Sequence, residues 1–297
     1  MCCAMAENSN PAVSRQASWF QTSWLNPVRR LARREPMLFI GAGMLLLLLM
    51  MALLPSIFAH QSPYTIDVSR ALKPPSAANL FGTDDTGRDV YARVVHGTGV
   101  TLAICAGSLL LAALAGGAAG SLSGYFGGWL DQALGRLVDV VLSFPPIVLG
   151  LIVTGVLGPA TRNLVLALSV VYLPVFFRIA RSGVMVETGK TYVEAARSIG
   201  LSESVILWRH VLRNIAPLLC VQYVVLFPLI LQIQAALGFL GLGVQPPTPD
   251  WGSILQQGKD SILVAPWLSL FPGLAILMAS LALLLVGRSL QRVVDRR

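Results

Sequence analysis

The feature that most constrains this chain is a series of long segments without a single charged residue. These runs cover 37–59, 94–130, 140–161, 163–177, 214–249 and 261–287. An α-helix rises about 1.5 Å per residue and needs about 20 residues to cross roughly 30 Å of hydrocarbon. The fourth run is short, but Arg162 and Arg178 bound it and their side chains can reach the two interfaces. The runs predict an all-α membrane protein with six transmembrane helices.

Composition supports a membrane chain and excludes several other classes of protein. Hydrophobic residues make up 55% of the sequence and charged residues 12%, whereas a soluble domain carries about 25% charged residues. This excludes a coiled coil, a disordered tail and most soluble enzymes. The 4 cysteines and 3 histidines show neither disulfide nor metal-ligand spacing. We therefore expect no metal site and no catalytic residues.

The distribution of lysine and arginine predicts that both termini lie in the cytoplasm. With the N-terminus inside, sixteen of the 22 Lys and Arg residues fall in the inside segments 1–36, 127–139, 178–213 and 288–297. Such residues are enriched in cytoplasmic loops, so topology accounts for the net charge of +8 without a nucleic-acid partner. The expected parts are a cytoplasmic tail (1–36), a first transmembrane helix (37–59), an external loop (60–97), a membrane core (98–287) and a cytoplasmic tail (288–297).

The spans carry no charged residue at their centres. This argues against a proton-coupled carrier and against a voltage sensor, so energy for any transport has to come from elsewhere. The fifth run does contain uncharged polar residues that either line a wet translocation path or bond between helices. These candidates are Gln222, Gln232 and Gln234.

Glycines and prolines mark where spans pack closely or bend. Glycine recurs every four residues at Gly116, Gly120, Gly124 and Gly128, which makes a ridge of small residues along one helix face. Such ridges allow two helix backbones to approach closely, although the last glycine is already near a loop. Prolines interrupt the third, fourth and fifth spans and favour kinks there, at Pro145–Pro146, Pro174 and Pro228.

A charged segment over 187–213 is the long cytoplasmic connection between spans. Thr191 and Glu194 have the T-x-x-E spacing of a capping box, which predicts a short helix from about Tyr192 to Ile199. Gly200 follows as the residue that tolerates a left-handed C′ position, and Ser202 is placed to cap a second helix. The segment is either a solvated connector or a rigid element that docks a cytoplasmic partner.

Four stretches of the chain together resemble the permeases of the peptide/nickel family of ATP-binding-cassette importers. Glu194-Ala195-Ala196, then Gly200, then His210-Val211-Leu212 resembles the EAA loop of these permeases. Leu80 to Val90 resembles the external signature before the second span, Leu237 to Gly252 the end of the fifth, and Pro272 to Ile276 the start of the sixth. The resemblance covers about residues 36–297.

The resemblance implies a transport subunit rather than an enzyme. It implies the C-type permease of a bacterial inner-membrane importer, with a second homologous permease, one or two cytoplasmic ATPase subunits and an external substrate-binding protein as partners. ATP and Mg²⁺ would be bound by the partner subunits, with no cofactor in this chain. The residues that the resemblance assigns to coupling with the ATPase are Thr191, Glu194, Ala195, Ala196, Gly200 and Leu201.

Two positions depart from the family pattern. Family members commonly have proline where Arg213 follows His-Val-Leu, and commonly have Gly-Asp where this chain has Gly287-Arg288. The first departure bears on how the cytoplasmic segment joins the fifth span. The second bears on the C-terminal tail, and neither changes the class of protein.

The external loop is long enough to have a function of its own. Thr86 and Asp89 are placed to cap a short helix over Gly87 to His96 that ends at Gly97. We expect the loop to cap the pore mouth or to touch the binding protein, the alternative being a solvated interfacial loop. The candidate residues are Gly82, Thr83, Asp84, Gly87, Arg88 and Asp89.

Peptides are the leading class of substrate, and nickel or a metal–chelator complex is the alternative. The spans offer no metal-ligand spacing, but this weighs little because the binding protein of such systems makes most of the choice. A stand-alone channel predicts pore rings, a secondary transporter predicts an inverted repeat with carboxylates, and a membrane enzyme predicts paired catalytic residues. The sequence shows none of these patterns, and a structural subunit without transport is disfavoured by the EAA resemblance.

Overall fold

The computed structural model describes residues 36–295, and this part of the chain is helical. Its β-type pairing is a single antiparallel bridge between Thr83 and Asp89. The elements are α3 (Pro36–Leu53), α4 (Pro55–Phe58), η1 (Val68–Arg70), α5 (Val90–Phe126), α6 (Gly128–Leu142), α7 (Pro146–Leu157), α8 (Thr161–Thr188), α9 (Thr191–Ser198), α10 (Glu203–Val205), the π-helix η2 (Ile206–Val211), α11 (Leu212–Phe239), α12 (Trp251–Gly258), η3 (Lys259–Ser261) and α13 (Trp267–Asp295). The all-α prediction is confirmed for these residues. The predicted N-terminal tail, apart from Pro36, lies outside them.

Four helical stretches are long and apolar enough to cross a membrane. They are α5, α8, the stretch Glu203–Phe239 that contains α11, and α13 as far as Arg292. A fifth span exists if α6 and α7 count as one, although they are bent by 93° at their junction, and α3 is apolar but shorter. The count of six transmembrane helices and the cytoplasmic position of the termini stay predictions.

The third span differs from the expected single helix over 140–161. Helix α6 already begins at Gly128, inside the expected loop 127–139. The helical structure is interrupted between Leu142 and Pro146. Because Pro145 has no N–H to donate, it cannot continue α6, while Pro146 suits the first turn of α7. Arg181 of α8 holds α6 in place through Asp131, with N···O distances of 2.5 and 2.6 Å.

The predicted glycine ridge packs α5 against α8, and α8 also contacts α6, α7 and α11. A Cβ atom added at Gly116, Gly120 or Gly124 would lie 2.4, 2.2 or 2.6 Å from the carbonyl oxygens of Leu173, Phe177 and Arg181 of α8, respectively. Only glycine therefore allows the two backbones to lie this close. Gly128 is not part of this contact, because a Cβ there would meet open space.

Proline and glycine elsewhere interrupt the helices less than expected. Pro174 lies inside α8 and Pro228 inside α11, and both helices continue through these residues. Helix α13 likewise continues past Gly287 and Arg288 as far as Asp295. The segment expected as a C-terminal tail from residue 288 is therefore an extension of the last helix within the described residues.

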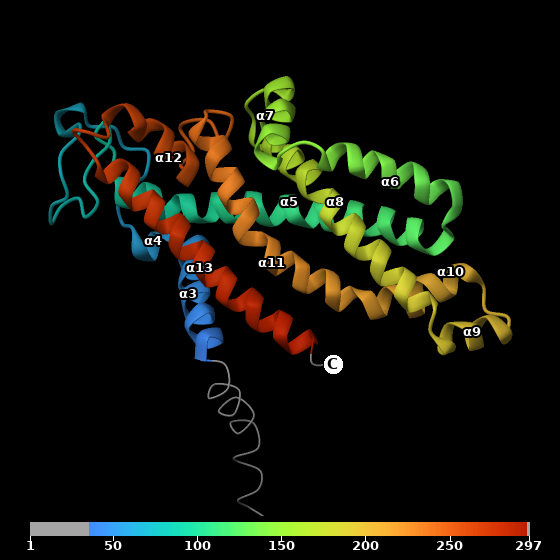
Figure 1. Ribbon diagram of the computed structural model, residues 1–297. Coiled ribbons are helices and arrows are strands. Elements are labelled where there is room, and N and C mark those ends of the chain that lie inside the picture. The colour runs from blue at the N-terminus through green and yellow to red at the C-terminus, as the bar shows by residue number, and fades with distance from the viewer. Residues whose placement is uncertain (1–35, 296–297) are drawn as a thin grey trace, which may run out of the picture.

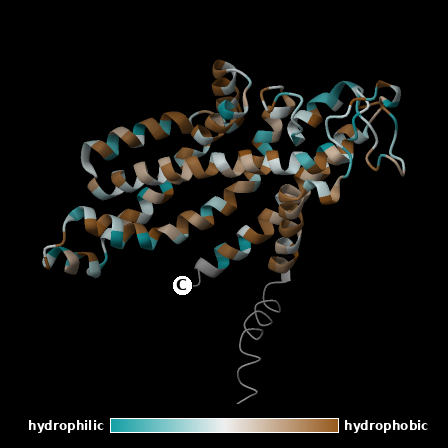
Figure 2. Ribbon diagram, turned by 180° about the vertical axis from the view of Figure 1, so that it is seen from behind, coloured by the Kyte–Doolittle hydropathy of each residue, from teal (hydrophilic) through white to brown (hydrophobic). Residues whose placement is uncertain are grey.

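The polar parts of the molecule lie at two opposite ends of the helices. Figure 1 shows the loop over 60–89 and α12 at one end, and α9 with α10 at the other. Helix α5 runs between the two ends, and α3 packs against α13 and α5. In Figure 2 the shafts of the long helices are mostly hydrophobic and hydrophilic residues gather toward the ends. Both groups of predicted site residues are therefore at the ends of the bundle.

Candidate functional site

Segment 187–213, which the sequence predicts to be cytoplasmic, folds as a compact knob on the ends of α8 and α11. Val193 and Ala196 of α9 point inward and are buried. They join a small hydrophobic cluster that also contains Ala180, Val184, Ile206, Leu207, Val211 and Ile215. The knob is thus fixed to both long helices by apolar packing, and α9 keeps a fixed orientation relative to them.

The start of α9 is not held by the expected capping box. Lys190 is the N-cap residue, its side chain makes no cap hydrogen bond, and Thr191 already lies inside the helix. Glu187 of α8 holds this turn instead: its Oε1 accepts from the Tyr192 hydroxyl at 2.7 Å and from Asn214 Nδ2 at 2.9 Å. Its Oε2 lies 2.6 Å from Lys190 Nζ. Burial and the Glu187 hydrogen bond raise the pKa of Tyr192.

The end of α9 agrees with the prediction. Gly200 has φ +82° and follows the helix as the left-handed C′ residue. Its N–H donates to Arg197 O at 2.9 Å, and the Leu201 N–H donates to Ala196 O at 3.2 Å. These two bonds form a Schellman motif, which satisfies the last carbonyl groups of the helix. A Cβ at Gly200 would meet open space, so only the backbone conformation favours glycine there.

Five of the six predicted coupling residues are exposed. Thr191, Glu194, Ala195, Gly200 and Leu201 face solvent, whereas Ala196 is buried in the knob. Within residues 36–295 the Glu194 carboxylate makes no hydrogen bond or ion pair. Sequence reasoning missed two exposed apolar neighbours, Ile199 at 77% and Trp208 at 68% exposure. The exposed surface of the knob therefore combines polar and large apolar groups.

The connection from the knob to α11 is a π-helix rather than a regular α-helix. Ser202 precedes α10 as predicted, but its side chain makes no cap hydrogen bond. The π-helix η2 follows and runs directly into α11. Arg213, the first of the two predicted departures from the family pattern, lies in the first turn of α11, and the helix continues through it without a break.

A polar contact also links the knob to α5. Arg197 of α9 donates from Nε to Glu203 Oε1 at 3.1 Å and from Nη2 to Oε2 at 3.3 Å. The Tyr125 hydroxyl, in the last turn of α5, donates to Glu203 Oε2. The Arg197 guanidinium also lies 6.0 Å from the centre of the Tyr125 ring. The hydrogen bonds to Glu203 and Tyr125 raise the pKa of Arg197, so its guanidinium stays charged.

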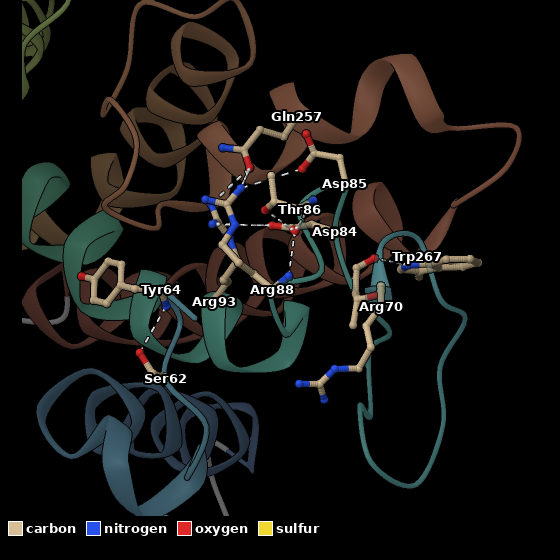
Figure 3. Close-up of polar contacts among 11 residues, drawn as sticks. Ser62, Tyr64, Arg70, Asp84, Asp85, Thr86, Arg88, Arg93, Gln257 and Trp267 are labelled. Carbon is tan, nitrogen blue, oxygen red and sulfur yellow. Dashed lines mark hydrogen bonds and ion pairs between the residues drawn. The ribbon is translucent and has the colours of Figure 1, made fainter. Parts of the chain in front are cut away.

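At the opposite end of the bundle, which the sequence predicts to be external, Asp84 is the centre of a buried polar network (Figure 3). Its Oδ1 accepts from Thr86 N, Thr86 Oγ1 and Arg88 N at 2.8–2.9 Å, and its Oδ2 accepts from Arg88 Nε at 2.7 Å. Arg88 and the fully buried Arg93 both donate to Gln257 Oε1 of α12, at 3.1 and 3.2 Å. The network joins the loop to the start of α5 and to α12.

Two glycines of the external loop are required by close backbone contacts. Gly82 has φ +74° and Gly87 has φ +77°. A Cβ at Gly87 would lie 1.8 Å from Asp67 O, and one at Gly82 would lie 2.7 Å from Lys73 O. Side chains cannot be accommodated at either position, so these residues shape the loop.

The predicted short helix over Gly87 to His96 is wrong in both bounds. Asp89 is the N-cap of α5, accepting from Ala92 N at 2.7 Å, and the helix continues from Val90 through Gly97 to Phe126. Gly97 does not end the helix but lies inside α5 and faces α12, where a Cβ would be 3.4 Å from Trp251 Cδ1, an ordinary van der Waals contact. The loop leads directly into the long helix.

All six predicted external residues are buried. Gly82, Thr83, Asp84, Gly87, Arg88 and Asp89 hold the loop together and do not form its outer surface. The exposed apolar side chains of the loop are others, namely Tyr64, Ile66, Val68 and Leu80. A partner that touches the loop meets these residues, while the predicted set determines how they are presented.

The three candidate path glutamines have different surroundings. Gln234 is fully buried and donates from Nε2 to Asp250 Oδ1 at 2.8 Å, which favours the alternative of bonding between helices. The Asp250 carboxylate also accepts from the Thr101 hydroxyl at 2.7 Å and from Ser253 N at 3.1 Å. Gln232 is exposed and Gln222 is half-buried, so both remain candidates for the path.

Burial raises the pKa of Asp250, while hydrogen bonds from Thr101 and Gln234 oppose this shift. Asp250 is the N-cap of α12, so one carboxylate connects α5, α11 and α12. Sequence reasoning named Asp250 only as part of a family stretch. Residues 36–295 contain no group of three or more His, Cys, Asp or Glu side chains placed to hold a metal ion.

Comparison with known proteins identifies similar sequences across most of this chain. The family described as "Binding-protein-dependent transport system inner membrane component" matches residues 116–297, which include the knob. The glutathione transport system permease protein of Pectobacterium atrosepticum is 33% identical over 275 residues, covering 93% of this chain and 91% of that protein.

Two further relatives have names that refer to dipeptides. The dipeptide transport system permease protein of Alkalihalophilus pseudofirmus is 32% identical and covers 92% of this chain and 89% of its own length. The probable D,D-dipeptide transport system permease protein of Escherichia coli K12 is 35% identical, covering 88% of each chain. The similarity thus extends through the external loop, the helices and the knob alike.

Proposed function

The chain belongs to the family of binding-protein-dependent transport system inner membrane components, and from this premise we propose that it is the C-type permease of an ATP-driven importer of di- and oligopeptides. It forms one half of a translocation path through the bacterial inner membrane. A second, homologous permease forms the other half. An external binding protein delivers the substrate.

The observation that carries this proposal is the geometry of the knob. Helix α9 is anchored through Val193 and Ala196 to the ends of α8 and α11, while Glu194 and Ala195 face outward. A force applied to the outer face of α9 therefore passes into two long helices. One or two cytoplasmic ATPase subunits dock on this face, and ATP and Mg²⁺ are bound by them.

The proposed topology has six spans with both termini in the cytoplasm. Helices α3, α5, α8, α11 and α13 are five of them, and α6 with α7 forms a broken sixth. Non-helical backbone at membrane depth is tolerated where protein covers it, and the break before Pro146 meets this condition in a complex of two permeases. The knob then lies on the cytoplasmic side, together with Lys190, Arg197, Arg209 and Arg213.

The names of the relatives support peptides as the substrate class. They refer to glutathione, dipeptides and D,D-dipeptides, which are all short peptides with a free carboxylate. Nickel or a metal–chelator complex remains the alternative within the same family of importers. Uptake of labelled dipeptide, glutathione and nickel by cells that express the complete transporter separates these substrates. Uptake of nickel alone would contradict the peptide proposal.

A pull-down in mild detergent tests the assembly. The tagged chain should retain a homologous permease and P-loop ATPases, identified by mass spectrometry, and the complex should hydrolyse ATP. Glu194→Lys reverses an exposed charge on the outer face of α9 and should release the ATPases. Asp85→Lys is the matched control, since it reverses an exposed charge in the external loop, which lies at the opposite end of the bundle from the knob.

Retention of the ATPases by Glu194→Lys would contradict docking on α9. Loss of the ATPases in both variants would indicate a general defect of assembly. A chain that purifies alone, under conditions in which a control complex survives, would favour a stand-alone channel or a membrane enzyme.

A further inference from the structure

Helix α5 connects the two polar ends of the molecule without interruption. It begins after the Asp89 cap in the external network and ends at Phe126, beside the knob (Figure 1). No proline lies inside it, unlike α8, α11 and α13. An unbroken helix moves as one body more readily than a kinked one.

The external end of α5 is bonded mainly to α12. Arg93 donates to Gln257, Thr101 donates to Asp250, and the Trp251 indole N–H donates to Val94 O at 3.0 Å. Each of these side chains is buried or partly buried. The orientation of this end of α5 is therefore tied to the external loop and α12.

The cytoplasmic end of α5 meets the knob through Tyr125. The Tyr125 ring packs against the hydrophobic cluster that contains Val193 and Ala196. Its hydroxyl donates to Glu203, and the Arg197 guanidinium lies over the ring. One side chain of α5 thus contacts groups on both sides of the turn at Gly200.

This contact differs from the way in which α8 and α11 hold the knob. Those two helices are continuous with the knob in the chain, so they follow its movement whatever the side chains are. Helix α5 has no such covalent link and reaches the knob by side-chain contact. The glycine ridge packs α5 closely against α8 from Gly116 to Gly124.

We propose that Tyr125 is a positioning residue that makes α5 the connection between the knob and the external end of the permease. The inference rests on the proposed function, in which ATPase subunits move the knob and a binding protein docks outside. Through Tyr125 a change in the knob alters the position of α5 and, with it, the bonds to Gln257 and Asp250. Docking of the binding protein acts on the knob by the same route in reverse.

The ion pair beside Tyr125 is suited to being tested without loss of the fold. Arg197 and Glu203 are both about half exposed, at 45% and 51% for their side chains. Exposed ion pairs contribute little to stability, so their removal should leave the chain inserted and assembled. A change in function would then reflect lost coupling.

The experiment uses the complete transporter reconstituted in liposomes with its binding protein and dipeptide. Two rates are measured: ATP hydrolysis with and without the loaded binding protein, and dipeptide uptake. In Tyr125→Phe, stimulation by the binding protein and uptake per ATP should fall by about fivefold or more, the lower end of typical allosteric coupling. Basal ATP hydrolysis should stay unchanged.

Tyr223→Phe is the matched control. The Tyr223 hydroxyl donates to Ala106 O of α5 at 2.9 Å, so this change also removes a hydroxyl bonded to α5, but within the bundle. Coupling in Tyr223→Phe should match the wild type. Equal losses in both variants would overturn the proposal, because they would reflect general packing of α5.

Charge exchange supplies a rescue test. Arg197→Glu should reduce uptake per ATP, and the double change Arg197→Glu with Glu203→Arg should restore much of it by remaking the pair. If Tyr125→Phe fails to assemble, Glu203→Ala removes the carboxylate that accepts from the Tyr125 hydroxyl, at an exposed position, and should give the same loss.

Wild-type uptake per ATP in Tyr125→Phe or in Glu203→Ala would overturn the role of Tyr125. A wild-type complex that shows neither ATP hydrolysis nor uptake would instead refute the proposed function, and the inference with it.

Discussion

The network around Asp84 and the knob at the other end of the bundle place charged residues and glycines in opposite environments. In the loop network, Asp84, Arg88 and Arg93 are buried, and both arginines pair with the Asp84 carboxylate. In the knob, Arg197 and Glu203 are half exposed and Glu194 faces solvent. Gly87 is enclosed by backbone atoms, whereas Gly200 has open space around it. The same residue types therefore determine the fold at one end and remain available to a partner at the other.

From this difference we infer which end can be substituted without a large loss of stability. Removing one member of a buried charge pair leaves the other without a partner in a region of low dielectric, which is strongly destabilising. Removing an exposed charge changes stability little. Changes in the external network should therefore reduce the amount of folded chain. Changes on the outer face of the knob should act on the transport cycle.

The largest expected effect is that of Asp84→Ala. It leaves Arg88 and Arg93 buried without their carboxylate and should lower stability by about 3–5 kcal/mol. Asp85→Ala is the control, because Asp85 is exposed and lies 3.8 Å from Arg88, and its effect should stay within about 0.5 kcal/mol. Thermal unfolding of the detergent-solubilised complex measures both. Equal stability of the two variants would contradict the comparison.

The two glycines give a matched pair with identical chemistry. Gly87→Ala places a Cβ 1.8 Å from Asp67 O in addition to an unfavourable φ, and should be destabilising by about 3 kcal/mol or more. Gly200→Ala has the unfavourable φ alone, so its effect should be about 1–2 kcal/mol. The amount of inserted chain and its melting temperature are measured. A larger loss of stability for Gly200→Ala than for Gly87→Ala would contradict the conclusion that only Gly87 is enclosed by its neighbours.

Asp250 should make stability depend on pH. Burial raises its pKa in the folded protein above the unfolded value of about 3.9. The folded state then holds its proton more tightly, so this contribution to stability is complete below about pH 4 and is lost as pH rises through the folded pKa. A tenfold difference in proton affinity between the folded and unfolded states corresponds to about 1.4 kcal/mol.

The check is the melting temperature from pH 4 to pH 8, compared between the wild type and Asp250→Asn. The asparagine side chain does not titrate, so the decline toward neutral pH should be shallower in the variant. A constant difference between the two curves would mean that Asp250 has the same pKa in both states.

Apart from the Asp85→Ala control, the smallest change in stability is expected for Glu194→Lys. The carboxylate lies in the first turn of α9, where the helix dipole favours a negative charge by about 0.3–1 kcal/mol. Because the capping box is not formed, no further hydrogen bond is lost. Melting temperature and ATPase retention are measured on the same preparation. A drop in melting temperature as large as that of Asp84→Ala would show that Glu194 stabilises the knob.

The features that the sequence predicted well depend on local geometry. Gly200 ends α9 because a left-handed residue is needed there. Asp89 caps a helix as the sequence predicts, but it does so as the N-cap of α5 and not together with Thr86. The glycine ridge also follows from spacing along one helix. For Gly200 and Asp89 the partner groups lie within one or two helical turns. The ridge itself follows from the spacing of glycines along one face, although the carbonyl groups that it meets belong to α8.

The features that the sequence did not predict depend on distant partners. Gln257 is 169 residues from Arg88 and 164 from Arg93, so the burial of these two arginines is invisible in local patterns. Thr191 does not have the predicted capping role. The start of α9 is held instead by Glu187, on the preceding helix, which bonds to Tyr192 and Lys190. Gly97 also faces a distant element, Trp251 of α12, and α5 continues through it.

The glycine ridge also has a consequence for the order of synthesis. Helix α5 ends at Phe126, but the carbonyl groups that its ridge packs against belong to α8, which ends at Thr188. Ribosomes add about 5–20 residues per second, so the intervening residues 127–188 take roughly 3–12 s. During this interval α5 is in the membrane without its intended neighbour. Its exposed glycine ridge is then free to pack against other helices. An insertase or the homologous permease that shields the ridge would protect the newly made chain from mispairing.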